Sequence, residues 1–238
     1  MRQIVFDLET TGFKYSEGHR IVEIGAIEMI NGAITGQNFH TYVNPERDMP
    51  PDAQRVHGIS AEFLRDKPLF ADPSVASAFA AFVEGAQLVA HNGIGFDLPF
   101  LQAELKGAGL PQLKNEIIDT LHIARRKFPG APASLDALCS RFRIDTKERE
   151  RDGHGALLDS RLLAEVYIEL TGGAQAGLDL MGRDNDTGSS GDGQAQQKRV
   201  ARQRPAALTS KITDEERAAH QAFLDELGDA CVWRQPVG

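Results

Sequence analysis

Cysteine and tryptophan are scarce in this sequence, which has two cysteines and one tryptophan among 238 residues. Cys139 and Cys231 lie far apart and match no spacing that is typical of a zinc or redox motif. No apolar run approaches the roughly 20 residues that a membrane-spanning helix needs, and the N-terminus has no apolar signal region. These absences argue against a cysteine-based metal site and a membrane span, and we expect a cytosolic protein with reduced thiols.

Positive charge is also in deficit, because 26 lysines and arginines face 34 aspartates and glutamates, for a formal net charge of −8. A protein that holds duplex DNA on its own neutralises phosphates with a basic surface. The charge balance therefore argues against such a protein. It is compatible with a nucleic-acid enzyme whose acids bind metal ions and whose affinity for DNA comes from a partner.

The order of hydrophobic patterns predicts an α/β domain. Residues 2–9, 20–30 and 33–43 are rich in Ile, Val, Phe and Thr and are expected as strands, with the hairpin signal Asn31-Gly32 between the last two. Further strands are expected over 87–91 and 115–118, and helices over 75–83, 96–106, 119–127, from Ser134, and over 155–170. This order indicates a mixed sheet covered by helices, in a domain that ends near residue 173.

The composition changes after this domain. Residues 182–207 hold almost no large apolar side chains, so they predict a flexible linker. The stretch TDEE at 213–216 is a capping-box signature and predicts a short amphipathic helix beyond the linker. Such a helix favours a docking segment for a partner over 208–238, and the alternative is that it folds back on the main domain. The apolar residues of this segment include Phe223, Leu224, Leu227 and the single tryptophan, Trp233.

Two acids stand at the end of the first expected strand, in the stretch IVFDLETTG (4–12). Asp7 and Glu9 are two residues apart, so both side chains leave the same face, opposite Phe6 and Leu8. Like charges this close repel each other unless a cation lies between them. A solvated edge strand also explains the pair, so these two residues do not by themselves decide between the alternatives.

Three later residues favour a metal site. HNGIGFDLPFL (91–101) places Asp97 at the start of a helix among apolar residues, and HGALLD (154–159) places His154 before the last helix and Asp159 inside it. The spacing of five lets His154 and Asp159 face one cavity. The alternatives are that Asp97 only stabilises a helix N-terminus and that His154 is structural.

The types of these residues indicate a reaction. Carboxylates without cysteine suit Mg²⁺ or Mn²⁺, and two such ions about 4 Å apart can clamp the attacking and leaving oxygens at a phosphorus atom. A histidine that titrates near neutral pH is a natural base for the attacking water. Metal-assisted phosphodiester hydrolysis is therefore predicted for the set Asp7, Glu9, Asp97, His154 and Asp159.

The motifs DLETTG, HNGIGFD and HGALLD resemble the three exonuclease motifs of the DEDDh 3′–5′ exonucleases. The resemblance extends through RIVEIGAIE, VHGIS, FPG…SLDALCSRF and TDEE…CVWR to the proofreading subunits of bacterial replicative polymerases. It implies an RNase H-like fold, with a mixed five-stranded sheet flanked by helices and a flexible C-terminal tail. It also implies a proofreading enzyme that removes mispaired 3′-terminal nucleotides as nucleoside 5′-monophosphates with two divalent ions, Mg²⁺ or Mn²⁺.

The resemblance assigns roles to individual residues. The four acids Asp7, Glu9, Asp97 and Asp159 correspond to the metal ligands, with Asp7 touching both ions, and His154 corresponds to the general base. Contacts to the 3′-terminal nucleotide are implied for Asp7, Glu9, Thr10, Asp52, His57 and Asp159. Thr11 is expected beside Thr10 at the strand end. Phe96 is expected in the core, and the alternative is that it wedges against bases. One departure is local: family members commonly have four residues between the histidine and aspartate of the second motif, where HNGIGFD has five.

The tail implies partners. QAGLDL (175–180) is similar to the short motif by which replication proteins bind the sliding clamp, through Gln175, Leu178 and Leu180. The docking segment resembles the part that binds the polymerase alpha subunit, through Phe223, Leu224, Leu227 and Trp233. The predicted organisation is a nuclease domain over 1–173, a clamp motif over 174–181, a linker over 182–207 and a docking segment over 208–238. The alternatives are a DEDDh exoribonuclease that trims RNA ends and a non-catalytic adaptor between polymerase and clamp.

Overall fold

The computed structural model describes residues 1–172 and 212–227. Its centre is a five-stranded sheet with the strand order β3-β2-β1-β4-β5. β1 pairs antiparallel with β2 and parallel with β4, while β2–β3 is antiparallel and β4–β5 is parallel. The sheet is mixed, as predicted. The strands are β1 (Arg2–Thr10), β2 (Ile21–Ile30), β3 (Ala33–Tyr42), β4 (Gln87–Ala90) and β5 (Ile117–Asp119).

β1 is the central strand, so the alternative of a solvated edge strand is wrong. Its side chains alternate between two apolar clusters, as the period of a strand requires. Ile4, Phe6 and Leu8 are buried in one cluster with residues of two helices. Val5 is buried on the opposite face with Leu163 of a third helix, and Asp7 and Glu9 continue this second face toward the end of the strand.

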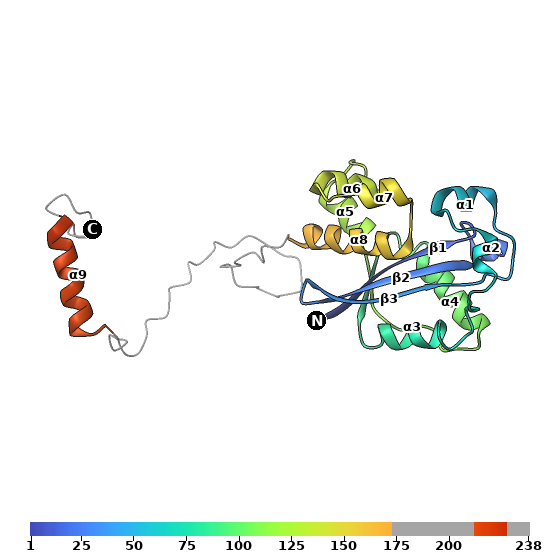
Figure 1. The fold of residues 1–238 in the computed structure, drawn as a ribbon, viewed down its shortest axis with the longest axis horizontal. Helices are drawn as coiled ribbons and strands as arrows, with labels where there is room; N and C mark the ends of the chain where they lie inside the picture. The colour runs from blue at the N-terminus through green and yellow to red at the C-terminus, as the bar shows by residue number, and fades with distance from the viewer. Residues whose placement is uncertain (173–211, 228–238) are drawn as a thin grey trace, which may run out of the picture. The chain divides into compact units, whose positions relative to one another are not determined.

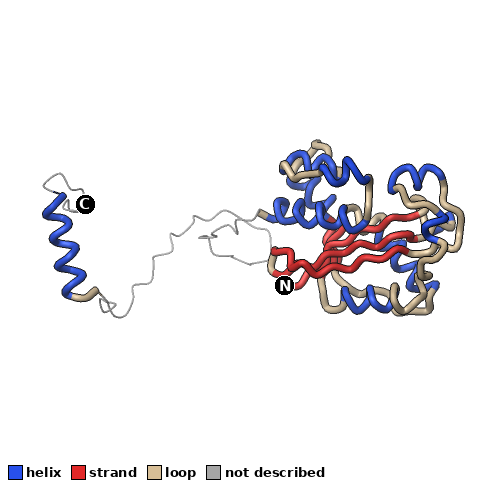
Figure 2. The backbone as a smooth tube through the Cα atoms, in the orientation of Figure 1, coloured by secondary structure: helices blue, strands red, loops and turns tan. Residues whose placement is uncertain are grey.

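Two layers of helices enclose the sheet, as Figures 1 and 2 show. The first layer holds α3 (Ala76–Val83) and α4 (Asp97–Gly107), which pack on the cluster of Ile4 and Phe6. The second layer holds α5 (Thr120–Lys127), α6 (Leu135–Phe142) and α8 (Ala156–Thr171). α8 contacts β1 and β2 directly. The sheet and its two layers therefore hold the core of residues 1–172.

The predicted helices and strands are present, with ends shifted by up to two residues at most positions. Ser134 is the N-cap of α6, as predicted, and its hydroxyl accepts a hydrogen bond from the Ala137 N–H at 3.2 Å. α7, which lies just before His154, was not among the helices expected from the sequence. The short helices are η1 (Tyr15–Glu17), α1 (Pro51–His57), α2 (Ala61–Leu64) and α7 (Lys147–Asp152).

α9 (Asp214–Leu227) is the helix expected from the capping box. The Thr213 hydroxyl accepts from the Glu216 N–H at 3.2 Å, and the Glu216 carboxylate accepts from the Thr213 N–H at 2.8 Å. On this helix the Phe223 side chain is exposed and Leu224 is buried. The predictions for 174–181, 182–207 and Trp233 lie outside the described residues. Within the described parts of the chain, no helix is long and apolar enough to cross a membrane.

Candidate active site

Two parallel strands bring the first three acids together. Asp7 and Glu9 lie in the last part of β1, and Asp97 is the first residue of α4, which follows β4. Parallel strands end at the same edge of a sheet, and the crevice beyond these ends is where α/β proteins bind ligands. The Asp97 carboxylate is buried, and the backbone N–H of Leu8, between Asp7 and Glu9, stabilises its charged form.

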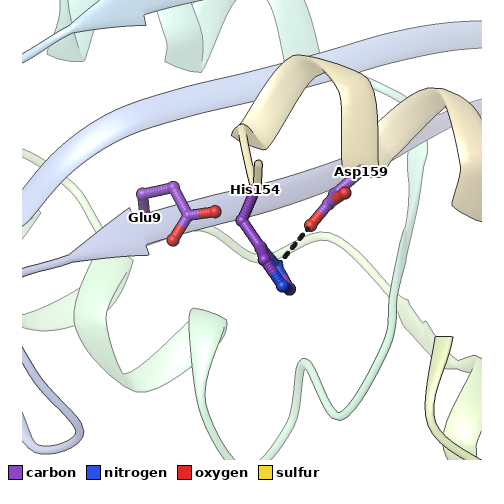
Figure 3. Close-up of side chains that lie close together, drawn as sticks. All are labelled: Glu9, His154 and Asp159. Carbon is purple, nitrogen blue, oxygen red and sulfur yellow. Dashed lines mark ion pairs between the residues drawn. The ribbon is translucent and has the colours of Figure 1, made fainter. Parts of the chain in front are cut away.

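The last helix adds His154 and Asp159 to the same place. Glu9, His154 and Asp159 each offer one ligand atom, and these atoms lie within 4.8 Å of one another. Figure 3 shows the His154 ring between the two carboxylates, with His154 Nδ1 3.3 Å from Oδ2 of Asp159. Asp159 is buried in the first turn of α8, while the His154 side chain is 40% exposed. The histidine therefore faces solvent, as a group that meets a substrate must.

Burial and the charges of neighbouring acids raise the pKa values of Asp7, Glu9 and Asp97. Burial raises the pKa of Asp7 well above its usual value, and the charges of Asp97, Glu9 and Asp159 raise it further. Burial and the charge of Asp159 raise the pKa of Glu9 to about 8, and burial raises the pKa of Asp97 to about 7. Such shifts are typical of carboxylates at functional sites, and a bound cation would favour their charged forms.

The donor set fits a divalent metal ion. The Oδ1 atom of Asp97 is buried without a hydrogen-bond partner, which is costly unless another ligand satisfies it. The cluster offers carboxylate oxygens and an imidazole nitrogen, with no sulfur ligand among its members. The acidic group at the end of β1 can therefore hold a hard cation.

Arg149 on α7 is a member of the site that the sequence analysis missed. Its side chain is 9% exposed, and its Nε lies 3.0 Å from Oδ1 of Asp159. Its Nη1 pairs with Asp136 on α6 at 2.5 Å, and its Nη2 is 2.7 Å from His154 Nδ1. The arginine charge lowers the pKa values of Asp7 and Glu9 and so offsets part of the repulsion. In the sequence, Arg149 belongs to the alternating charge run KERERD, which gives no sign of burial.

The longer second motif forms a compact turn between β4 and α4. The Asp119 carboxylate at the end of β5 accepts hydrogen bonds from the backbone N–H groups of Asn92 at 3.0 Å and Ile94 at 3.3 Å. Asn92 has a φ of 61°, which asparagine tolerates better than most residues. A Cβ on Gly93 would lie 2.4 Å from the Ala90 Cβ, so this position requires glycine. The turn therefore delivers Asp97 to the site despite its extra residue.

The histidines near the site have different surroundings. His57 is buried and lines a cavity of about 430 Å³ together with His154. Its Nδ1 accepts from the Ile59 N–H at 3.0 Å, and its Nε2 has no hydrogen-bond partner. Burial lowers the pKa of His57 and also that of His91, whose Nδ1 lies 2.9 Å from the Thr120 hydroxyl. His57 thus opens on the same cavity as His154, while His91 supports the second motif.

The remaining predicted residues are not gathered as closely. Asp52 on α1 has a side chain that is 90% exposed and pairs with Arg55 at 3.1 Å. The Thr10 hydroxyl donates to the Gly12 carbonyl at 2.7 Å, and the Thr11 N–H donates to the Arg20 carbonyl at 2.9 Å. Both threonines therefore shape the loop after β1. Phe96 packs against the core, as predicted, with its ring centroid 5.2 Å from that of Phe100.

Comparison with known proteins places this geometry in a family. A sequence model of the RNase T family, described as exonuclease, matches residues 4–167. A Rickettsia felis protein named DNA polymerase III subunit epsilon is 46% identical over 231 residues, which cover 95% of this chain and 97% of the relative. The Escherichia coli K12 protein of the same name is 44% identical over 244 residues, covering 98% of this chain and 97% of the relative.

The chain belongs to the epsilon branch of the exonuclease family. This is the branch that the sequence resemblance indicated, and it makes the chain a proofreading 3′–5′ exonuclease, in a family that works with divalent metals. The structure of exonuclease X in complex with 5′ overhanging duplex DNA matches at a TM-score of 0.54 and 28% identity, covering 71% of this chain and 90% of that chain. E. coli exonuclease I in complex with a dT13 oligonucleotide matches at a TM-score of 0.58 and 18% identity, covering 71% of this chain and 40% of that chain. This likeness shows the fold alone.

Proposed function

We propose that this exonuclease proofreads for DNA polymerase III by hydrolysing the last phosphodiester bond of a mispaired primer end with two metal ions. The product is a nucleoside 5′-monophosphate. The observation that carries the proposal is the convergence of Glu9, His154 and Asp159 within 4.8 Å, beside the buried Asp97. The epsilon subunits in the comparison match this chain over nearly their whole length, which supports the polymerase as the enzyme's context.

The four carboxylates are the proposed metal ligands. Asp7, Glu9, Asp97 and Asp159 would hold two Mg²⁺ or Mn²⁺ ions, with Asp7 central because it interacts with the other three acids. Bound ions would supply Lewis-acid stabilisation of the charge that develops on the attacking and leaving oxygens. The raised pKa values of Glu9 and Asp97 mean that protons compete with the metal near neutral pH.

His154 is the proposed general base, which takes a proton from the attacking water. A base needs a ring nitrogen with a free lone pair. The guanidinium of Arg149 can only donate hydrogen bonds and contacts His154 Nδ1 at 2.7 Å, so this contact engages the lone pair of the neutral ring, and we propose that it opens when the attacking water binds. The exposure of the His154 ring gives the water access to it.

The 3′-terminal nucleotide is proposed to lie in the cavity that His57 and His154 share. The buried Nε2 of His57, which has no hydrogen-bond partner, is the proposed contact to a phosphate or sugar oxygen there. The other proposed contacts to this nucleotide lie at the end of β1 and beside it: Asp7, Glu9 and Thr10 on the strand, and Asp159 on α8. Asp52 takes part only if the α1 surface turns toward the strand, since its carboxylate now pairs with Arg55. A mismatched end frays at low cost and so presents the single strand that this site would accept.

The C-terminal part is proposed to provide the partners. Residues 208–238 would bind the polymerase alpha subunit, and 175–180 would bind the sliding clamp, within the bacterial cytoplasm at the replication fork. The exposed Phe223 on α9 offers an apolar contact for such a partner. Flexible linkage raises the effective concentration of a tethered enzyme to roughly millimolar, which would compensate for the acidic charge of this chain.

Asp7→Asn tests the reaction. This change keeps the shape of the side chain but removes a charge from the centre of the acidic cluster, so we expect at least a 100-fold loss in the rate of digestion of a 3′-mispaired primer with Mg²⁺ or Mn²⁺. Release of labelled nucleotides measures the rate. Full activity of this variant would contradict the proposed mechanism.

Matched DNA and RNA oligonucleotides in the same assay separate the alternatives. Faster digestion of DNA supports proofreading, whereas faster digestion of RNA would favour an exoribonuclease. No metal-dependent digestion of either substrate would favour the adaptor. His154→Ala serves as a second variant, because it should lose most turnover while it still binds Mn²⁺ in a calorimeter.

A further inference from the structure

Glu23 is a buried acid on β2 that has no role in the proposed hydrolysis, although it lines the cavity that His57 and His154 share. It is 3% exposed. Its Oε1 lies 2.7 Å from Nε2 of His40 on β3, and its Oε2 accepts a hydrogen bond from the Ala156 N–H at 3.1 Å. Both carboxylate oxygens are therefore occupied by protein groups. This distinguishes Glu23 from Glu9, which lies directly opposite it in the β1–β2 register.

The Ala156 N–H is at the start of α8, where helices have donors without partners inside the helix. The N-cap residue is Gly155, which offers no side-chain oxygen, and no side-chain cap is present at this helix end. Glu23 supplies the missing acceptor from a different element. Its negative charge also lies at the positive end of the helix dipole. Glu23 thus caps α8 across the sheet.

Two further contacts fix the same helix turn on β2. A Cβ on Gly25 would lie 2.2 Å from the backbone carbon of Ala156, so the helix backbone lies directly on the strand. The Ser160 hydroxyl lies 2.9 Å from the Gly25 carbonyl and 2.7 Å from the Ala156 carbonyl, and its single proton is shared between these two acceptors. The first turn of α8 is therefore held at a defined height and rotation above the sheet.

The two groups of the proposed reaction that this region supplies lie on either side of Ala156, the capped residue. His154 lies two residues before Ala156, and Asp159 lies three residues after it. We propose that Glu23 is a positioning residue, which holds the first turn of α8 so that His154 and Asp159 face Glu9, and that His40 in turn orients the Glu23 carboxylate. This inference rests on the proposed function of His154 and Asp159 in hydrolysis.

The first test is steady-state kinetics of full-length Glu23→Ala and Glu23→Gln on a single-stranded DNA oligonucleotide with Mn²⁺. Positioning predicts that the alanine variant loses about 10-fold or more in kcat, because the capped turn carries His154 and Asp159. KM should rise as well, because Glu23 and this turn line the proposed substrate cavity. The glutamine variant keeps a carbonyl oxygen for the Ala156 N–H and should recover kcat to within about 3-fold of the wild type.

Glu28→Ala is the matched control. Glu28 lies on the same strand, and this substitution also removes an ion pair, which joins Glu28 to Arg2 at 2.6 Å. We expect its kcat to equal that of the wild type. Equal losses of kcat in Glu23→Ala and Glu28→Ala would overturn the proposal, as would a Glu23→Ala variant with a lower melting temperature and an unchanged kcat.

Hydrogen exchange of the backbone amides gives a readout that needs no metal and no activity. Glu23→Ala should speed exchange of the Ala156 amide at least 10-fold, while amides in the second half of α8 keep their wild-type rates. Glu23→Gln should keep the Ala156 amide protected. An unchanged Ala156 amide in Glu23→Ala would overturn the capping role. An inactive wild-type enzyme with the expected exchange pattern would instead contradict the proposed function.

Discussion

At the residue scale, Glu9 and Asp97 show how the acids of a metal site lower the stability of the folded protein before the metal binds. Each is held where burial disfavours its charge, and the pKa values rise to about 8 for Glu9 and about 7 for Asp97. The folded chain therefore holds protons that the unfolded chain releases. Proton binding by Glu9 and Asp97 therefore contributes to the free energy of unfolding. This contribution is fully present below the ordinary carboxyl pKa and is lost as the pH rises through 7 to 8.

Glu9→Gln should therefore stabilise the metal-free protein at alkaline pH. The amide stays neutral, so the variant escapes the loss that the ionised Glu9 causes. Each kcal/mol corresponds to about 2–4 °C in melting temperature for a domain of this size, and we expect a gain of several degrees at pH 8.5 in EDTA. The gain should vanish near pH 4.5, where the wild-type group is also neutral.

Glu28→Gln is the control for this prediction, because the hydrogen bond from Arg2 lowers the pKa of Glu28 instead of raising it. Its melting temperature at pH 8.5 should not increase. Added Mn²⁺ should raise the melting temperature of the wild type more than that of Glu9→Gln. A Glu9→Gln variant that melts lower than the wild type at pH 8.5 in EDTA would contradict the electrostatic account.

At the scale of elements, the close contact between β2 and α8 decides the geometry of the site. β2 contributes no proposed metal ligand, yet Glu23 and Gly25 on this strand hold the helix that carries Asp159. The contact is backbone against strand, without an intervening side chain. A strand and a helix far apart in sequence thus form one rigid support for the last two groups of the site.

Gly25→Ala should test this support. The new methyl group would overlap the backbone at Ala156, and overpacking of this kind typically costs about 1–3 kcal/mol. We expect a lower melting temperature and at least a 10-fold loss of kcat, since the first turn of α8 must move. Thermal unfolding and nucleotide release measure the two effects.

Gly107→Ala is the matched control, because a Cβ there meets only the Tyr15 hydroxyl at 3.8 Å, an ordinary contact. A glycine-to-alanine change at a helix position of this kind is usually neutral or stabilising. Its kcat should match the wild type. If Gly25→Ala behaved in the same way as Gly107→Ala, the rigid support would not exist.

At the scale of the whole molecule, catalysis and delivery are proposed to belong to separate parts. The core and the acidic cluster lie within 1–172. A fragment of residues 1–173 should therefore digest a DNA oligonucleotide with a kcat within about 2-fold of the full chain. The same fragment should not co-elute with the polymerase alpha subunit in gel filtration, because it lacks the proposed docking segment.

Deletion of 208–238 alone separates docking from clamp binding. This variant keeps 175–180 and should retain both nuclease activity and any clamp binding, while it loses the polymerase. Continued co-elution with the alpha subunit would contradict the docking role of the tail. Substituting Gln175, Leu178 and Leu180 together by alanine should have the opposite effect, with loss of the clamp and retention of the polymerase.

The sequence alone predicted the five strands and the longer helices, and it proposed the five residues Asp7, Glu9, Asp97, His154 and Asp159 for the site. Alternation along β1 separates Asp7 and Glu9 from Phe6 and Leu8, and the capping box before α9 is a local signal. Such features depend on neighbours within a few residues, where strand and helix geometry is regular. The motif order then supported a family in which these residues act together.

Only the tertiary structure decided that β1 is central, that Arg149 enters the site and that Glu23 caps α8. Arg149 stands in a run of charges that is typical of a solvated surface, and its burial depends on where α7 packs. Glu23 is 133 positions from the residue that it caps. Local patterns carry no information about such distant contacts, because the register of the sheet and the close approach at Gly25 create them only when the chain folds.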